Sequence, residues 1–196
     1  MEYWCKKVFA GEYAIAYRPE TPPTVLDLGA NCGAFSVWAT QVWPGAIVHA
    51  YEPAQINYDY LKQNTETLPN VHIHKLAVLG PNTDKTKLFC GKENQGQASF
   101  FTDVNPLLDG TYELPDIIHP RDLPKADILK ADTEGCEFEI ILGMNQAGIL
   151  PEVIMLEYHR EFDRRAIDIE LRDYDLVGSL AEQSHRGVVK YMRRQK

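Results

Sequence analysis

The stretch VLDLGANCG, residues 25–33, decides the fold expected of this chain. Its first four residues predict a buried strand that ends at Gly29, where the absence of a side chain permits a tight turn. Residues 34–43 then carry apolar side chains at helical spacing, and the Pro-Gly pair that follows predicts the end of a helix. We therefore expect a strand, a glycine-bearing turn and a helix in direct succession.

The alternation of strand and helix continues along most of the chain. Further strands are predicted at residues 46–51, 71–78, 127–131 and 153–157, and further helices at 54–68, 136–142 and 161–171. Such an alternation is typical of a parallel sheet with right-handed crossovers. Residues 174–177 and 188–192 are expected to close the sheet as a final pair. The sequence thus predicts one Rossmann-like α/β domain over residues 1–196, with a mostly parallel, doubly wound sheet and an antiparallel closing strand.

An insertion at residues 85–124 interrupts this alternation. Residues 85–90 and 97–101 predict two strands around a polar turn, and residues 102–124, rich in Pro, Asp and Gly, are expected to be mostly irregular. A long irregular stretch inside a compact domain is often functional. We expect a small β insertion whose loop covers the substrate pocket as a lid.

Composition and charge narrow the class of protein. The chain has 196 residues, of which 44% are hydrophobic, and a formal net charge of −8. A surface of that sign favours a small neutral or cationic substrate over nucleic acid. No apolar run is long enough to span a bilayer and none resembles a secretory signal, so a cytoplasmic protein is expected. The four cysteines form no C-x-x-C pair, which argues against a zinc knuckle or a redox dithiol.

The turn and the end of the second strand together predict a nucleoside site. The helix after the turn begins near Gly33, so its free N–H groups and its dipole suit an anion. Glu52 stands nineteen residues after Gly33, at the end of the second strand. An acid at this place in a doubly wound sheet accepts hydrogen bonds from ribose hydroxyls. A nucleoside with an attached anionic group is therefore the expected ligand.

The glycine spacing distinguishes between nucleosides. The dinucleotide fingerprint G-x-G-x-x-G uses its second glycine to leave backbone room for pyrophosphate. Here Gly29 and Gly33 form G-x-x-x-G, and Asn31 occupies the middle position. Asp27 is expected to project its carboxylate toward the pocket, where it repels pyrophosphate and attracts an ammonium group. S-adenosylmethionine carries an α-amino group, a carboxylate and a ribose, and it matches these features. The simpler alternative is that the glycines only make a turn and Asp27 only caps the helix.

Several stretches resemble the FkbM family of methyltransferases. The resemblance rests on VLDLGANCG at residues 25–33, AYEP at 50–53 and ILKADTEGCE at 128–137, with similar segments at 9–13 and 155–159. It implies a class I methyltransferase fold and an acceptor that is commonly a hydroxyl group on a sugar or natural product. The residues that it implies around S-adenosylmethionine are Asp27, Gly29, Asn31, Gly33 and Glu52.

Acidic and basic residues follow two strands of the second half of the sheet, where the transfer chemistry is expected. The first strand is followed by Asp132, with Lys130 as its expected ion-pair partner, and the second carries Glu157 and His159. Transfer to a hydroxyl group requires removal of its proton, and a neutral imidazole suits that task. We therefore expect Glu157 and His159 to accept the proton, supported by Asp132. The helix-start acids Glu134 and Glu137 are equally compatible with a stabilising role at the helix dipole.

Three alternatives remain open at this stage. Asp132 and Glu157 end adjacent strands and could converge on a divalent cation. A second alternative is a nucleoside-binding module without transfer chemistry. A third is a tRNA methyltransferase, prompted by the polar helix that contains residues 57–64. The sequence does not indicate the acceptor, the methylated atom or the oligomeric state.

Overall fold

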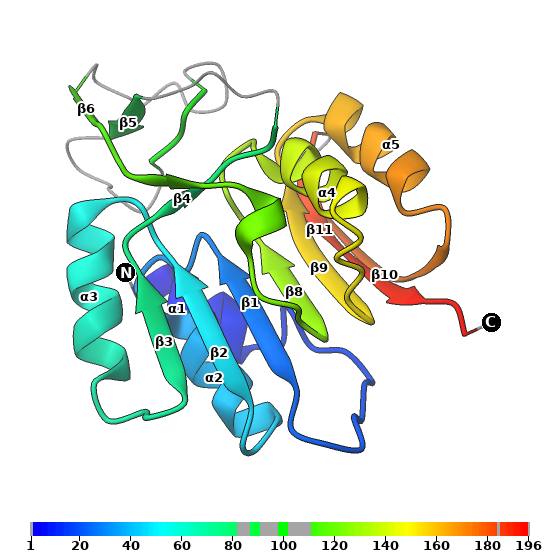
Figure 1. Cartoon of the computed structure of the whole chain (residues 1–196), viewed down its shortest axis with the longest axis horizontal. Helices are drawn as coiled ribbons and strands as arrows, with labels where there is room; N and C mark the ends of the chain where they lie inside the picture. The colour runs from blue at the N-terminus through cyan, green and yellow to red at the C-terminus, as the bar shows by residue number, and fades with distance from the viewer. Residues whose placement is uncertain (1, 82–86, 91–97, 102–110, 184, 196) are drawn as a thin grey trace.

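The computed structural model describes residues 2–81, 87–90, 98–101, 111–183 and 185–195. Its centre is a seven-stranded sheet with the strand order β10-β11-β9-β8-β1-β2-β3 (Figure 1). These strands are β1 (Thr24–Leu28), β2 (Ile47–Tyr51), β3 (Val71–His74), β8 (Ile128–Ala131), β9 (Val153–Tyr158), β10 (Tyr174–Gln183) and β11 (Arg186–Arg193). Strands β3, β2, β1, β8 and β9 are parallel, and β11 pairs antiparallel with both β9 and β10. The predicted parallel sheet with an antiparallel closing pair is confirmed.

Helices cover the sheet on both faces, as its apolar strands require. Helices α1 (Glu2–Phe9), α2 (Ala34–Val42) and α3 (Gln55–Thr65) lie on one side, and α4 (Glu137–Gln146) and α5 (Glu161–Glu170) on the other (Figure 1). Successive residues of a strand point to opposite faces. Val25 therefore packs in the core with Trp38 of α2, whereas Leu26 packs in the core with Ile140 of α4. Helix α1 was not predicted from the sequence.

The region after β3 differs from the prediction. The strand expected at residues 71–78 is divided, because β3 ends at His74 and β4 (Ala77–Val78) leaves the main sheet to pair with β7 (Ile117–Ile118). Strand β5 (Leu88–Cys90) pairs with β6 (Thr111–Glu113), while the expected strand at residues 97–101 contributes a single bridge between Ser99 and Phe89. A 3₁₀ turn, η2 (Pro120–Asp122), follows β7.

The expectation of a mostly irregular segment at 102–124 is therefore wrong for residues 111–122. These strands are only two or three residues long and form through pairing with distant segments. The many turn-forming residues around them therefore predicted an irregular segment. The proposed lid falls partly on residues 102–110, which lie outside the described residues.

Within the described part of the chain, no helix combines the length and apolar character needed to cross a membrane.

Candidate active site

The turn after β1 has the backbone geometry of a ligand-binding loop. Gly29 and Gly33 have φ angles of +73° and +87°, and Asn31 has a φ of 52°. A Cβ at Gly29 would lie 1.8 Å from the carbonyl oxygen of Asp132, so only glycine fits where the first turn meets the end of β8. Helix α2 starts directly after Gly33 with no side-chain cap. The backbone of Ala34 interacts with the thiol of Cys32, and the positive end of the helix dipole suits an anion.

A pocket opens beside this turn, at the carboxyl ends of the parallel strands. Its wall combines the turn with acidic side chains and with apolar side chains from α1, α2 and the insertion. Gly29, Asn31 and Glu52 line one part, whereas Asp132 and Glu157 line another. The apolar wall includes Val8, Tyr13, Phe35, Leu88, Ala98 and Phe100. One cavity thus joins three of the five expected cofactor residues to two of the expected transfer residues, whereas Asp27 and Gly33 are not part of its lining.

Glu52 is held at the edge of the turn by backbone hydrogen bonds. Its carboxylate accepts hydrogen bonds from the N–H of Asn31 at 2.8 Å and from the N–H of Ala54 at 2.9 Å. The side-chain amide of Asn57 donates a longer bond of 3.4 Å. Burial raises the pKa of Glu52 to about 7, although these hydrogen bonds favour the ionised form. Each carboxylate oxygen has two lone pairs, so acceptor capacity remains for a ligand.

Asp27 does not face the pocket, and this expectation was wrong. Its fully buried carboxylate accepts a 2.7 Å hydrogen bond from the hydroxyl of Ser36 and lies 3.1 Å from the ammonium of Lys130. Lys130 also donates to the carbonyl of Gly29 at 2.7 Å. Asp27 and Lys130 are register partners on β1 and β8, which explains why Lys130 pairs with Asp27 and not with Asp132. Asp27 therefore stabilises the turn indirectly, through Lys130.

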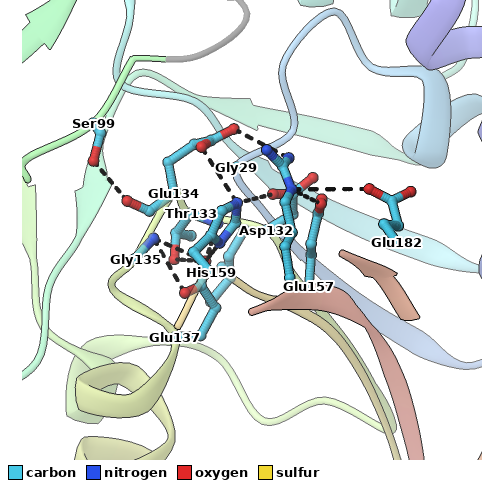
Figure 2. Close-up of polar contacts among 12 residues, drawn as sticks. Gly29, Ser99, Asp132, Thr133, Glu134, Gly135, Glu137, Glu157, His159 and Glu182 are labelled. Carbon is cyan, nitrogen blue, oxygen red and sulfur yellow. Dashed lines mark hydrogen bonds and ion pairs between the residues drawn. The ribbon is translucent and has the colours of Figure 1, made fainter. Parts of the chain in front are cut away.

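His159 lies at the centre of an acidic cluster just beyond β8 and β9, as Figure 2 shows. Its Nε2 lies 3.3 Å from Glu134 and 4.0 Å from Asp132, and its Nδ1 lies 3.3 Å from Glu137. Burial alone would lower the pKa of His159, but Glu137 and Glu134 raise it well above the ordinary value. The charges of Glu134 and Glu137 therefore favour the protonated form of His159, whereas a neutral imidazole was expected.

Glu137 belongs to this cluster and was missed as a site residue. It is fully buried, and its carboxylate accepts hydrogen bonds from the N–H of Thr133 at 2.7 Å and from the N–H of Gly135 at 3.1 Å. The hydroxyl of Ser99 fixes the same loop by donating to the carbonyl of Glu134 at 2.6 Å. Glu134 itself has a positive φ of 51°. The sequence signal was the position of Glu137 at the start of a helix, which was equally compatible with a role at the helix dipole.

Glu157 has a different partner from the one expected. The guanidinium of Arg186 donates to its carboxylate, and the guanidinium also lies 3.8 Å from Glu134. Glu157 is 2% exposed, and burial together with the charge of Asp132 raises its pKa to about 8. Glu157 thus pairs with Arg186 and not with His159 as expected. His159 instead contacts Glu134 and Glu137. Arg186 comes from β11 and was not identified from the sequence.

The possible metal ligands of the acidic cluster differ from the pair that the sequence predicted. Potential ligand atoms of Asp132, Glu137 and His159 lie within 4.8 Å of one another, and Glu157 is not in this group. The Glu137 carboxylate already accepts several hydrogen bonds, and both nitrogens of His159 face carboxylates. The donor atoms that lie together are thus those of Asp132, Glu137 and His159, and not those of the expected pair Asp132 and Glu157.

The sheet order, the glycine turn and the acids at the strand ends define a methyltransferase of the class I fold. Residues 27–196 match the family described as Methyltransferase FkbM domain. The chain belongs to this FkbM methyltransferase family, and the resemblance stated from the sequence is confirmed.

Known relatives agree with this assignment. Methyltransferase sdnD from Sordaria araneosa is 29% identical over 217 residues, which cover 90% of this chain and 83% of the relative. Methyltransferase 1 from Beauveria bassiana is 22% identical, with 74% of this chain and 68% of the relative covered.

Solved structures share the fold. Methyltransferase FkbM from Methylobacillus flagellatus superposes with a TM-score of 0.60 at 17% identity over 90% of this chain, which spans 45% of that protein. Magnesium protoporphyrin IX methyltransferase from Synechocystis, solved with bound SAM, gives a TM-score of 0.52 at 13% identity. That alignment covers 98% of this chain and 79% of the other.

Proposed function

We propose that this methyltransferase transfers the methyl group of S-adenosylmethionine to a hydroxyl group of a small molecule, such as a sugar or natural product. The observation that carries the proposal is the single pocket that joins the turn at Gly29 and Glu52 to the acids Asp132 and Glu157. One part of this pocket has the chemistry to hold a nucleoside, and the other has the chemistry to accept a proton.

The donor is expected to bind through Glu52 and the turn. The Oε2 atom of this buried carboxylate accepts one hydrogen bond, from Asn31, so a lone pair is left for a ribose hydroxyl. Gly29, Asn31 and Gly33 form the surrounding loop, and the uncapped start of α2 suits the carboxylate of the amino-acid part. The sulfonium supplies an already activated methyl group. A structural neighbour with bound SAM supports this donor for the fold.

Glu157 is assigned the proton-accepting role. A hydroxyl group becomes a good nucleophile only as its proton leaves, and a base works best when its pKa lies near the working pH. Glu157 lines the pocket, and its pKa is raised to about 8. Asp132, whose side chain is 24% exposed, also lines the pocket and is placed to hold the hydroxyl hydrogen. The chain's contribution is therefore alignment and proton removal.

His159 is assigned a positioning role in this scheme. It is absent from the pocket wall as described, but its ring contacts Glu134 and Glu137 and lies near Asp132. The imidazolium offsets the charge of these acids and so keeps the loop after β8 in place. All three expected transfer residues thus retain a role, although the role of His159 has changed.

The acceptor is expected to combine hydroxyl groups with apolar surface. The pocket wall also carries Tyr13, Phe35 and Phe100, and apolar contacts provide most of the binding of small molecules in such sites. The net charge of −8 supports a small molecule over nucleic acid.

An acceptor screen tests the transfer. The protein is incubated with S-adenosylmethionine and a library of sugars, polyketide alcohols and matched amines, and products are identified by mass spectrometry and NMR. The proposal expects S-adenosylhomocysteine and a methyl ether, both reduced in Glu157→Gln. Methylation of nitrogen or carbon alone would overturn the hydroxyl assignment, even if donor turnover is observed.

A further inference from the structure

Two cysteines from distant parts of the chain lie in contact beside the pocket. The Sγ atom of Cys5, on α1, lies 3.8 Å from the Sγ atom of Cys32, in the turn after β1. Cys32 also lines the pocket. The two residues are 27 positions apart, so the spacing of the cysteines in the sequence did not indicate this contact. Both are present as thiols.

The two thiols differ in their access to solvent. Cys5 is partly exposed, whereas Cys32 is 2% exposed. Burial raises the pKa of the Cys32 thiol to about 11, with a further contribution from Cys5. An oxidant from solvent therefore meets the sulfur of Cys5 first, and the sulfur of Cys32 is in place to react with the product. A reachable thiol beside a second thiol is the usual arrangement of a redox-sensitive pair.

The turn that carries Cys32 is fixed by its own contacts. The N–H of Cys32 donates to the side-chain oxygen of Asn31 at 2.7 Å, and the side-chain amide of Asn64 donates to the carbonyl of Cys32 at 2.8 Å. A Cβ at Gly33 would lie 2.8 Å from the side chain of Leu61, so the turn is also packed closely against α3. A disulfide bond is about 2.0 Å long, so the two sulfurs must approach by about 1.8 Å. We expect this movement to come mainly from α1.

Movement of α1 changes the pocket. Val8 on α1 and the residues Glu12 and Tyr13 just after it line the pocket. The ring of Tyr13 lies 5.4 Å from that of Phe35 on α2, measured between centroids. A bond at Cys5 therefore draws one wall of the pocket toward the turn where the donor is expected to bind. The proposed methyl transfer uses neither cysteine.

We propose that a hydroperoxide converts Cys5 and Cys32 to a reversible disulfide, and that this bond slows entry of the donor into the pocket. The Cys5 thiolate attacks one peroxide oxygen, the O–O bond breaks and hydroxide leaves, which gives a sulfenic acid. The sulfur of Cys32 then attacks the sulfur of Cys5 and expels a second hydroxide. The two thiol protons convert both hydroxides to water, so two thiols lose two electrons to one peroxide. A thiol reductant reverses the reaction by exchange.

Peptide mass spectrometry tests the disulfide without any donor. The protein is treated with hydrogen peroxide, remaining thiols are blocked with N-ethylmaleimide, and the digest is analysed with and without dithiothreitol. The proposal expects a cross-link between Cys5 and Cys32 that dithiothreitol removes and that Cys5→Ser lacks. Cys90→Ser changes a partly exposed cysteine on β5 and is the matched control, which should form the same cross-link. Absence of the cross-link, or equal pairing of Cys5 with Cys90 or Cys136, would overturn the proposal.

Stopped-flow binding of S-adenosylhomocysteine tests the effect on donor entry, which rests on the proposed function. Association should be at least about tenfold slower in the oxidised protein, since a segment that borders a pocket controls entry. Dithiothreitol should restore the rate, and peroxide should leave the rate of Cys5→Ser unchanged. Equal rates for oxidised and reduced protein would overturn the control of entry even where the cross-link forms. Lack of binding to the reduced protein would instead contradict the donor site, and with it the control of entry, while the cross-link would stand.

Discussion

The ammonium of Lys130 lies 3.1 Å from the carboxylate of Asp27, and both side chains are enclosed beneath the turn that the proposed donor binds. Lys130 also donates to the carbonyl of Gly29, so the pair connects β1 and β8 to that turn. A buried ion pair is costly to break, because removing one partner leaves the other charge buried and unpaired.

The first prediction concerns this pair. Lys130→Met leaves Asp27 buried without its cation, and the free energy of unfolding should fall by about 3–5 kcal/mol. Urea unfolding measures the change, and Lys62→Met on the exposed side of α3 is the control with an expected effect within about 0.5 kcal/mol. A loss for Lys130→Met no larger than the control would show that the pair does not stabilise the fold.

The second prediction concerns the pH dependence of donor binding. The pKa of Glu52 is raised to about 7, so the carboxylate becomes protonated as the pH falls through that value. Ribose hydroxyls need the ionised acceptor, so the Kd for S-adenosylhomocysteine should rise by up to about tenfold per pH unit below pH 7. Calorimetry at pH 6 and pH 8 measures this. Glu52→Gln should bind weakly with a much smaller pH dependence, and equal slopes for the two proteins would rule out Glu52 as the titrating group.

The third prediction concerns proton removal. Glu157→Gln should lower kcat by about 10²–10⁴-fold while the Kd for the donor stays within about twofold. A base acts in its ionised form, so the kcat of the unchanged enzyme should rise as the pH rises through about 8, the raised pKa of Glu157. Glu161→Gln, an exposed acid on α5, is the control. A kcat in Glu157→Gln close to that of the control would assign the base elsewhere, with Asp132→Asn the next variant to examine.

The fourth prediction concerns the imidazolium of the acidic cluster. His159→Gln leaves Glu137 buried without a cation and should destabilise the protein by about 3–5 kcal/mol. Replacing both residues, in His159→Gln with Glu137→Gln, removes the uncompensated charge and should recover part of the loss. A double-mutant cycle by chemical unfolding measures this coupling. Additive losses would show that the two side chains do not interact.

The central strands could be predicted well because they are short, mostly apolar segments with clear ends. Residues 25–28 and 153–157 are buried on both faces, so their pattern hardly depends on partners. Strands β6 and β7 were missed for the opposite reason. They consist of a few residues in a segment rich in turn formers, and they exist only because β5 and β4 lie beside them.

The sequence predicted that these acidic and basic side chains lie near one another, but not which of them are in contact. Parallel strands end at the same edge, which explains why Asp132, Glu157 and His159 lie close together, as expected. Which acid contacts which base depends on side-chain direction and on partners from other elements. Arg186 reaches Glu157 from β11, and Glu137 reaches His159 from the start of α4. Neither contact has a signal in local sequence spacing.

Calorimetric titration of the protein and of Glu52→Ala with S-adenosylmethionine and with NAD tests the proposed donor pocket most directly. The expected result is binding of one S-adenosylmethionine per chain, weakened in Glu52→Ala by about 1.5–3 kcal/mol from the loss of charge-assisted hydrogen bonds, with no comparable binding of NAD. Equal affinity for NAD, or an unchanged Kd for S-adenosylmethionine in Glu52→Ala, would contradict the assignment of this pocket.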